Sequence, residues 1–290
     1  MVQFWSALAA RDTELMTHVM GTHFPEVLNN ATYATYIRCH DDIGWAITEE
    51  DAEAVGVTGP GHRAFLSDFY EGIFPGSFAR GALFGVNEKT GDKRMSGSFA
   101  SLAGLERALD EGDAAGVDRA VARINLGHTL IAGYGGIPLI YMGDEIAMLN
   151  DYGYRDDPDH ARDSRWLHRS EMDWGVVDRV RRGDDGSPES RVWHGLKHIL
   201  DRRKATPELH AGHPVRVPVA PVKGVFALLH DAPTGPLLCL FNFTEDTVFV
   251  PGEWALGEGV EALHDALTDR PAQMDNGNLV LLPYGSLWLR

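Results

Sequence analysis

Apolar and polar positions alternate along the chain in blocks that predict helices and strands in turn. Residues 2–20 carry apolar side chains at helical spacing, which predicts one helix. Residues 33–39 are rich in β-branched and aromatic side chains and predict a strand. His40-Asp41-Asp42 follow this strand directly, so these three polar side chains are expected where the chain turns.

Residues 43–117 have a different character, with many glycines, short polar runs and scattered aromatic side chains. Short helices are expected around 49–56, 61–73 and 99–109. A long structured excursion of this kind within a compact protein is usually functional.

A second strand and two further helices follow this excursion. Residues 118–134 have a helical pattern, which the pair Gly135-Gly136 ends. Residues 137–142 form a continuous apolar run, which favours a parallel strand buried on both faces. After a polar excursion over 147–190, residues 191–205 predict another helix.

From about residue 213 the pattern changes to short β runs separated by Pro, Gly, Asn and Asp. Such runs predict an antiparallel β domain. They cover residues 215–222, 225–229, 237–243, 247–250, 279–282 and 286–289.

Strands that alternate with helices imply parallel βα units, as in α/β proteins. Polar residues cluster after each strand, and in a (β/α) barrel that is the face on which active sites are built. The overall expectation is therefore an α/β part followed by an all-β domain.

The net charge of the chain excludes some classes of binding partner. It has 26 Lys and Arg against 42 Asp and Glu, a formal net charge of −16. Phosphate backbones and anionic lipid surfaces repel such a chain, so we expect neither nucleic acid nor a membrane as partner. A neutral small molecule is permitted, and the acidity is sufficiently explained by solubility.

The two cysteines, Cys39 and Cys239, lie far apart and build neither a disulfide framework nor a cysteine metal site. The histidines form no metal-ligand pattern, so no metal and no cofactor are expected. No apolar run reaches transmembrane length, and the first residues lack the basic start of a signal peptide. We expect a cytoplasmic protein with reduced thiols, although secretion without a visible signal stays open.

Three motifs carry the candidate chemistry, and each alone is weak. His40-Asp41-Asp42 also fits a solvated turn with a capping carboxylate. Gly143-Asp144-Glu145 also fits acidic residues that favour a helix start. Asp163-Ser164-Arg165-Trp166 also fits a surface arginine packed on an aromatic ring.

Together, the motifs resemble glycoside hydrolase family 13, the α-amylase family, and within it the amylosucrases. Residues 36–45, Tyr-Ile-Arg-Cys-His-Asp-Asp-Ile-Gly-Trp, resemble the end of barrel strand seven, and residues 136–145 resemble the strand-eight segment. The amylosucrase likeness adds Glu-Asp-Ala at 50–52 and three longer stretches. These are Gly-Ser-Phe-Ala-Arg-Gly at 76–81, Thr-Gly-Asp-Lys-Arg-Met-Ser-Gly at 90–97 and Asp-Ser-Arg-Trp-Leu-His-Arg at 163–169. The resemblance runs over nearly the whole chain and is weakest in the β tail.

The resemblance implies a fold with four parts. They are a barrel helix and strand seven (1–42), an inserted loop domain (43–117), the last barrel helices with strand eight (118–210) and a C-terminal β-sandwich (211–290). The chain would thus hold the last part of a (β/α)8 TIM barrel and the antiparallel domain that follows it.

The resemblance also implies roles for seven residues. Asp41 matches the carboxylate that stabilises the transition state by gripping ring hydroxyls, and His40 matches its neighbour in the donor subsite. Arg165 matches an arginine that closes the donor pocket by pairing with an upstream Asp. Asp42 and Arg94 match acceptor-side residues, and the channel beside them is expected to include Arg63 and Phe65.

One departure from the family pattern concerns the two carboxylates that a retaining mechanism needs, a nucleophile and a general acid/base about 5–5.5 Å apart. Both should precede His40 by a long stretch, yet the 39 residues before it offer only Asp12, Glu14 and Glu26. We therefore expect the chain to lack both groups. Glu145 is no substitute, since its expected role is structural, at the barrel rim.

Three functions stay open. The first, which we favour, is the C-terminal part of an amylosucrase-like glucosyltransferase that uses sucrose and builds α-glucan, from a truncated gene or from a split gene with the first half of the barrel on a separate chain. The second is a non-catalytic sugar-binding remnant of that family. The third is a sucrose or α-glucan hydrolase, since water and glucan compete for the same intermediate. Arg94 favours transfer, and the chain alone is expected to be inactive.

Overall fold

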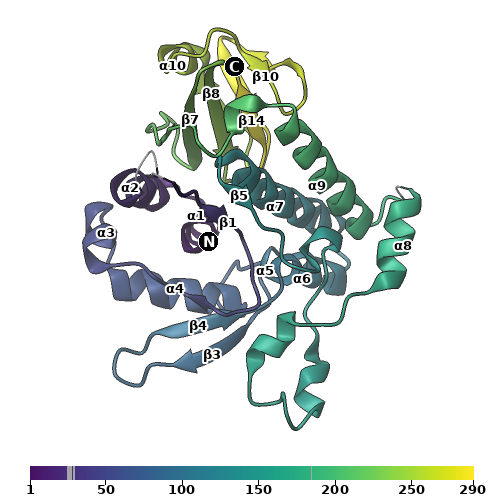
Figure 1. Cartoon of the computed structure of the whole chain (residues 1–290). Coiled ribbons are helices and arrows are strands. Elements are labelled where there is room, and N and C mark those ends of the chain that lie inside the picture. The colour runs from purple at the N-terminus through teal and green to yellow at the C-terminus, as the bar shows by residue number, and fades with distance from the viewer. Residues whose placement is uncertain (25–27, 29, 184) are drawn as a thin grey trace. The chain divides into compact units, whose positions relative to one another are not determined.

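The computed structural model describes residues 1–24, 28, 30–183 and 185–290, and Figure 1 labels the elements along the chain. Glu26 therefore lies outside the described residues. The chain divides into two compact units, each built from separate stretches. Unit 1 comprises residues 1–2, 37–124 and 140–195, and unit 2 comprises residues 3–36, 125–139 and 196–290.

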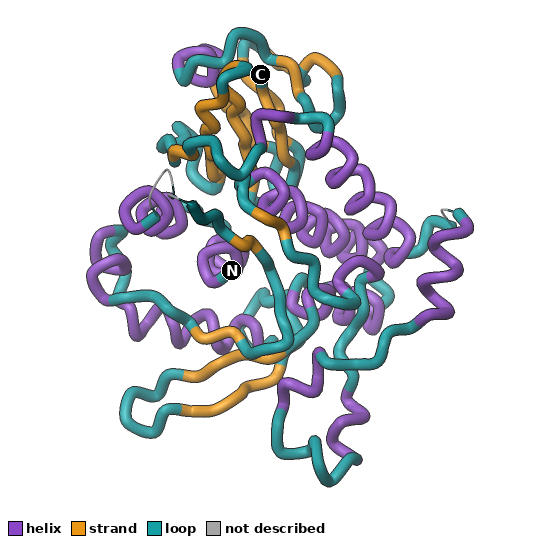
Figure 2. The backbone as a smooth tube through the Cα atoms, viewed as in Figure 1, coloured by secondary structure: helices purple, strands orange, loops and turns teal. Residues whose placement is uncertain are grey.

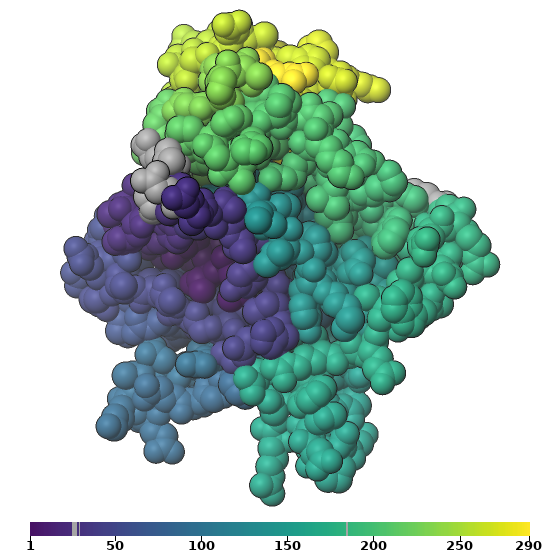
Figure 3. All heavy atoms as spheres, in the orientation of Figure 1, coloured from purple at the N-terminus to yellow at the C-terminus, as the bar shows by residue number. Residues whose placement is uncertain are grey.

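Unit 1 combines short helices with one small antiparallel sheet. The sheet order is β2-β4-β3, with Ile43 opposite Met95 and Leu83 opposite Met95 on the other side. Its strands are β2 (Ile43–Gly44), β3 (Ala82–Val86) and β4 (Lys93–Ser96). The tip of the β3–β4 hairpin is exposed and stands out from the surface in Figure 3.

The helices of unit 1 confirm most of the periodicity predictions. They include α3 (Glu49–Ala54), α4 (Gly59–Glu71), α5 (Phe99–Leu102), α6 (Leu105–Glu111) and α8 (Trp174–Arg182). The polar excursion after residue 140 has three short 3-10 turns, η1 (Asp144–Ile146), η2 (Tyr152–Asp156) and η3 (Ser164–His168), joined by loops (Figure 2). Two longer helices, α7 (Ala114–Gly133) and α9 (Pro188–Lys204), contribute residues to both units.

The prediction of one helix over 2–20 is wrong, because the chain breaks between α1 (Val2–Ala10) and α2 (Glu14–His23). Arg11 adopts a left-handed backbone conformation with φ 54°. The Asp12 carboxylate then accepts a hydrogen bond from the Glu14 backbone N–H at 2.9 Å, which satisfies a donor at the start of α2.

Unit 2 contains the parallel pairing that the βα pattern predicts, but in shortened form. Strand β1 (Ala34–Thr35) pairs in parallel with β5 (Ile137–Pro138). The apolar run 137–142 was expected to be buried on both faces, and this is wrong. Ile137 is 54% exposed and Leu139 48% exposed, because the described residues add no further strand to this two-stranded sheet.

The C-terminal part of unit 2 confirms the antiparallel β prediction. One sheet has the order β11-β10-β14-β8-β7-β6 and the other β12-β13-β9. Its long strands are β7 (Val225–Ala232), β8 (Gly235–Asn242), β9 (Val248–Pro251), β13 (Asn278–Leu281) and β14 (Ser286–Leu289). The sequence analysis missed the shorter elements α10 (Gly252–Gly257), β10 (His264–Asp265), β11 (Arg270–Pro271) and β12 (Met274–Asp275). The edge strand β6 (Val215–Arg216) pairs with β7, and the 3-10 turn η4 (Pro207–Leu209) precedes it.

Both sheets contribute to one hydrophobic core, as in a β-sandwich. Leu229, Leu240 and Leu289 come from the first sheet, and Val250 and Leu279 come from the second. Alternate residues of β7 and β8 enter this core, and the apolar residues between them are buried as well.

Both cysteines are free thiols, and burial raises the pKa of Cys239 well above its usual value. Among the described helices, none combines the length and the apolar character needed to cross a membrane.

Candidate functional site

The candidate site lies in unit 1, on the loop that follows residue 37, and a buried arginine anchors it. Arg38 is only 1% exposed. Its Nε donates to the carbonyl of Gly97 and its Nη2 to the carbonyl of Asp41, both at 2.9 Å. Burial lowers the pKa of Arg38, while the charge of nearby Asp144 opposes that shift. The loop is thereby tied to the residue that follows β4.

Arg165 holds the side chain of Asp41 from the other side. Its Nη1 donates to Asp41 Oδ1 at 3.0 Å, while Nε and Nη2 donate to the two carboxylate oxygens of Asp163 at 2.9 and 2.8 Å. The guanidinium also lies 4.5 Å from the centre of the Phe84 ring. The hydrogen bond from Arg165 lowers the pKa of Asp41 to about 2, so this carboxylate is ionised at neutral pH.

Asp42 has the opposite environment. It is 8% exposed, and its pKa is raised by burial, by a hydrogen bond with Asp41 and by the charge of Asp41. The exposed Arg94 guanidinium reaches its Oδ2 at 3.4 Å. Adjacent carboxyl groups thus differ in protonation behaviour, a pattern that is common at functional sites.

His40 contributes its backbone rather than its ring to these contacts. Its carbonyl accepts a hydrogen bond from Arg169 Nε at 2.7 Å, and the side chain is exposed. The imidazole is therefore accessible to a ligand that lies beside Asp41.

A groove of about 730 Å³ adjoins Arg94 and also contains Arg63. Arg63 donates to Asp92 Oδ1 at 2.7 Å and to the carbonyl of Ile47 at 2.8 Å. Trp45 forms part of its wall. A groove of this volume is large enough for a drug-sized ligand.

The structure brings four of the seven candidate residues into one chain of contacts: Asp41 with Arg165 and with Asp42, and Asp42 with Arg94. Arg63 shares the groove with Arg94, and His40 is the neighbour of Asp41. Phe65 does not line the groove. It belongs to an aromatic cluster formed by α4 and the turn that follows it, with ring centres 5.7 Å from Phe69 and 4.9 Å from Phe74.

Three residues that shape this site lie in the motifs quoted from the sequence but received no role there: Arg38, Asp163 and His168. His168 is buried, its Nδ1 accepts from the Gly97 backbone N–H at 3.3 Å, and burial lowers its pKa to about 3. The position of Arg38 within the otherwise apolar residues 36–39 indicates a buried charged side chain, and the sequence alone could have shown this. Glu145 Oε2 accepts a hydrogen bond from the Gly143 backbone N–H at 2.7 Å.

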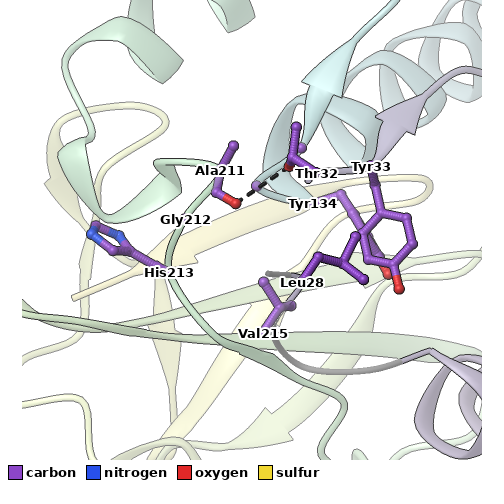
Figure 4. A pocket seen from close by; sticks show the side chains of 10 residues that line it. Leu28, Thr32, Tyr33, Tyr134, Ala211, Gly212, His213 and Val215 are labelled. Carbon is purple, nitrogen blue, oxygen red and sulfur yellow. Dashed lines mark hydrogen bonds between the residues drawn. The ribbon is translucent and has the colours of Figure 1, made fainter. Parts of the chain in front are cut away.

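A second hollow, in unit 2, is too small for a sugar. It lies beside Tyr33, Tyr134 and His213, where Thr32 Oγ1 donates to the carbonyl of Ala211 at 3.3 Å (Figure 4). Its volume of about 30 Å³ holds about one water molecule.

Residues 215–290 match the family model described as the amylosucrase C-terminal domain. The matched segment is the β tail, where the sequence analysis expected the weakest resemblance.

Solved structures give a likeness in fold. The catalytic module of the glycogen-degrading pneumococcal virulence factor SpuA has a TM-score of 0.50 and 15% identity, over 67% of this chain and 34% of that one. AmyP in complex with maltose has a TM-score of 0.45 and 21% identity, over 59% and 34%. A MutB mutant in complex with isomaltulose has a TM-score of 0.41 and 18% identity, over 58% and 38%.

The chain thus spans about a third of the length of the solved structures that it matches. In fold it is similar to part of the SpuA catalytic module, and its residues 215–290 match the amylosucrase C-terminal domain.

Proposed function

We propose that the chain is part of an amylosucrase-like glucosyltransferase, which transfers a glucosyl group from sucrose to an α-glucan with retention of configuration. The observation that carries the proposal is the clamped, ionised Asp41. Its carboxylate can accept hydrogen bonds from two ring hydroxyls, and these bonds strengthen as the ring flattens toward an oxocarbenium ion. His40 and Arg165 complete the donor side.

The groove beside Asp42 supplies the acceptor side in this proposal. Arg94 and Arg63 present guanidinium donors in a groove of about 730 Å³. A hydroxyl-rich acceptor gains affinity from such donors, whereas water does not need them. The proposal therefore favours transfer over hydrolysis, and Phe65 is left outside the acceptor channel.

The nucleophile and the general acid/base must come from elsewhere. Asp41 and Asp42 share a hydrogen bond, so they lie closer together than the separation of about 5 Å that a retaining pair requires. In addition, Arg165 and Arg94 already engage them. We assign both missing roles to a separate segment or chain that carries the earlier barrel units, a partner whose existence is part of the proposal.

Fructose release from sucrose tests the proposal. The chain alone is expected to release none. Co-expressed with the first six βα units of an amylosucrase-type barrel, it is expected to release fructose. In that complex Asp41→Asn should lower kcat by roughly 10²–10³-fold with a smaller change in KM, because a preorganised charged contact in the transition state is lost. Turnover by the chain alone, or an unchanged kcat in Asp41→Asn, would contradict the assignment.

The products separate the remaining alternatives. Arg94→Ala should shift the complex from polymer toward free glucose, and free glucose from the unmodified complex would indicate a hydrolase. A non-catalytic sugar-binding protein is supported by the engagement of both Asp41 and Asp163 with the guanidinium of Arg165. It would bind sucrose in the complex without releasing fructose.

A further inference from the structure

Gly97, in the short connection between β4 and α5, is held through both of its backbone polar groups (Figure 1 labels the two elements). Its N–H donates to Nδ1 of the buried His168 at 3.3 Å, and its carbonyl accepts from Arg38 Nε at 2.9 Å. A Cβ at this position would lie 2.8 Å from the side chain of Leu102. Only glycine therefore allows the chain to pack this closely against α5.

Arg38 connects Gly97 to the backbone of Asp41. Its Nη2 donates to the Asp41 carbonyl at 2.9 Å, while its Nε holds the carbonyl of Gly97. A planar guanidinium presents its donors in a fixed fork, so the two carbonyls are held in one relation to each other. The position of the Asp41 main chain therefore depends on the position of Gly97.

His168 holds Gly97 from the 3-10 turn η3. The same turn contains Arg165, whose Nη1 donates to Asp41 Oδ1 at 3.0 Å. Burial lowers the pKa of His168 to about 3, although backbone carbonyls of the Asp41 loop oppose this shift, so the ring is neutral at pH 7 and Nδ1 can accept. One turn thus holds Asp41 twice, its carboxylate through Arg165 and its backbone through His168, Gly97 and Arg38.

We propose that His168 is a positioning residue, which acts through Gly97 and Arg38 to set the direction of the Asp41 carboxylate. It does not meet the substrate, because it is buried and does not line the groove. This role rests on the proposed function, in which Asp41 must meet the ring hydroxyls in one geometry. A displacement of about 1 Å can lower a rate by roughly 10²-fold, so indirect support of this kind affects kcat.

The pKa of Asp41 in the 290-residue chain tests the positioning without requiring turnover. His168→Phe keeps a ring of similar size and removes the acceptor. The Asp41 carboxylate should then lose its alignment with Arg165, and its pKa should rise from about 2 by roughly 0.5–1 units. His168→Asn keeps an acceptor oxygen near the position of Nδ1 and should keep the pKa near its original value. Carboxyl-carbon NMR during an acid titration measures each pKa.

Two further variants separate positioning from a general loss of stability, with circular dichroism verifying the fold of each. His230→Phe changes a buried histidine of unit 2 and should leave the pKa of Asp41 unchanged. Arg38→Lys keeps the charge but cannot span both carbonyls, so it should raise the pKa of Asp41 as His168→Phe does. It decides the question if His168→Phe does not fold.

Either of two results would overturn the positioning role. Equal shifts in His168→Phe and His168→Asn would assign the effect to the charge of the histidine at low pH. An unchanged pKa of Asp41 in His168→Phe, or in Arg38→Lys, would show that the Asp41 carboxylate keeps its direction without this support.

Fructose release by the complex with the earlier barrel units gives a second measurement. His168→Phe should lower kcat about tenfold with KM changed by less than about twofold, and His168→Asn should recover most of the loss. Full kcat in His168→Phe would overturn the positioning role and leave the glucosyltransferase proposal standing. An inactive unmodified complex would contradict the glucosyltransferase proposal, and the pKa of Asp41 would then decide the positioning role by itself.

Discussion

At the scale of single residues, neighbouring carboxylates behave differently because different groups surround them. Asp41 receives a guanidinium hydrogen bond, whereas Asp42 is buried beside the charge of Asp41. The sequence Asp-Asp predicts neither environment, since Arg165 lies 124 residues away.

Removing the Arg165 side chain should raise the pKa of Asp41 toward its usual value. In Arg165→Ala we expect the pKa of Asp41 to rise from about 2 by roughly 1–2 units, because the charged hydrogen-bond donor is lost. Carboxyl-carbon NMR during an acid titration measures the shift. Arg169→Ala is the control, because Arg169 contacts the His40 carbonyl. A pKa that stays near 2 in Arg165→Ala would mean that the Asp42 backbone N–H holds the charge alone.

Asp42→Asn should stabilise the protein at neutral pH. The pKa of Asp42 is raised in the folded state. Its contribution to stability is therefore fully present below the unfolded pKa of about 3.9, and it is lost as the pH rises through the folded-state pKa. The substitution removes the buried charge, so its free energy of unfolding should exceed that of the unmodified protein at pH 7.

The difference should shrink toward pH 3, and urea denaturation at both pH values measures it. Asp41→Asn should show the opposite sign, since the depressed pKa of Asp41 contributes stability above about pH 4 that is lost as the pH falls toward 2. Equal effects of the two substitutions would show that burial does not distinguish the two carboxyls.

At the scale of elements, helix α4 ends at a glycine that no other residue can replace without strain. Gly72 has φ 91°, and a Cβ there would lie 2.6 Å from the carbonyl oxygen of Ala79. Gly56, after α3, has φ 78° and open space around its Cβ position. The two glycines share the left-handed conformation and differ in their surroundings.

Gly56→Ala should therefore cost about 1 kcal/mol, and Gly72→Ala clearly more, in the free energy of unfolding. The backbone conformation accounts for the shared part, and the collision with Ala79 for the difference. Urea denaturation of both variants measures it. Equal losses would mean that the loop at Ala79 yields without cost.

Helices were more predictable from the sequence than strands, and the reason is physical. A periodic apolar face needs only its own residues to define a helix, so 118–134 and 191–205 were located within a few positions. The run 137–142 needs neighbouring strands on both sides to become a buried strand, and within the described part of the chain one strand pairs with it. The site follows the same rule: the motif locates Asp41 and Arg165, but the anchoring by Arg38 depends on Gly97, 59 residues away.

At the scale of the whole molecule, buried histidines should make the protein sensitive to acid. Burial lowers the pKa of His168 to about 3 in unit 1 and that of His230 to about 4 in unit 2. A histidine whose pKa is lowered in the folded state stabilises the protein above the unfolded pKa of about 6.5. This contribution to the free energy of unfolding is lost as the pH falls. Between pH 7 and pH 5, each of these two histidines should lower the free energy of unfolding by about 2 kcal/mol.

Urea denaturation at pH 7 and pH 5 measures the loss. Substitution of His230 by Gln removes one titrating group and should flatten the dependence, whereas His40→Gln, at an exposed position, should not. A free energy of unfolding that is constant over this range would contradict the burial of neutral histidines.

Unit 2 joins the first residues of the chain to the last, and this has a consequence for synthesis on the ribosome. Phe4 packs against Phe243 with ring centres 5.7 Å apart, and Thr13 Oγ1 donates to the carbonyl of Val225, 212 residues later. At a translation rate of roughly 5–20 residues per second, about 10–40 s pass between the synthesis of the first helix and that of the strands it packs against. During that time its apolar face, with Trp5 and Leu8, is open to chaperones that bind emerging chains.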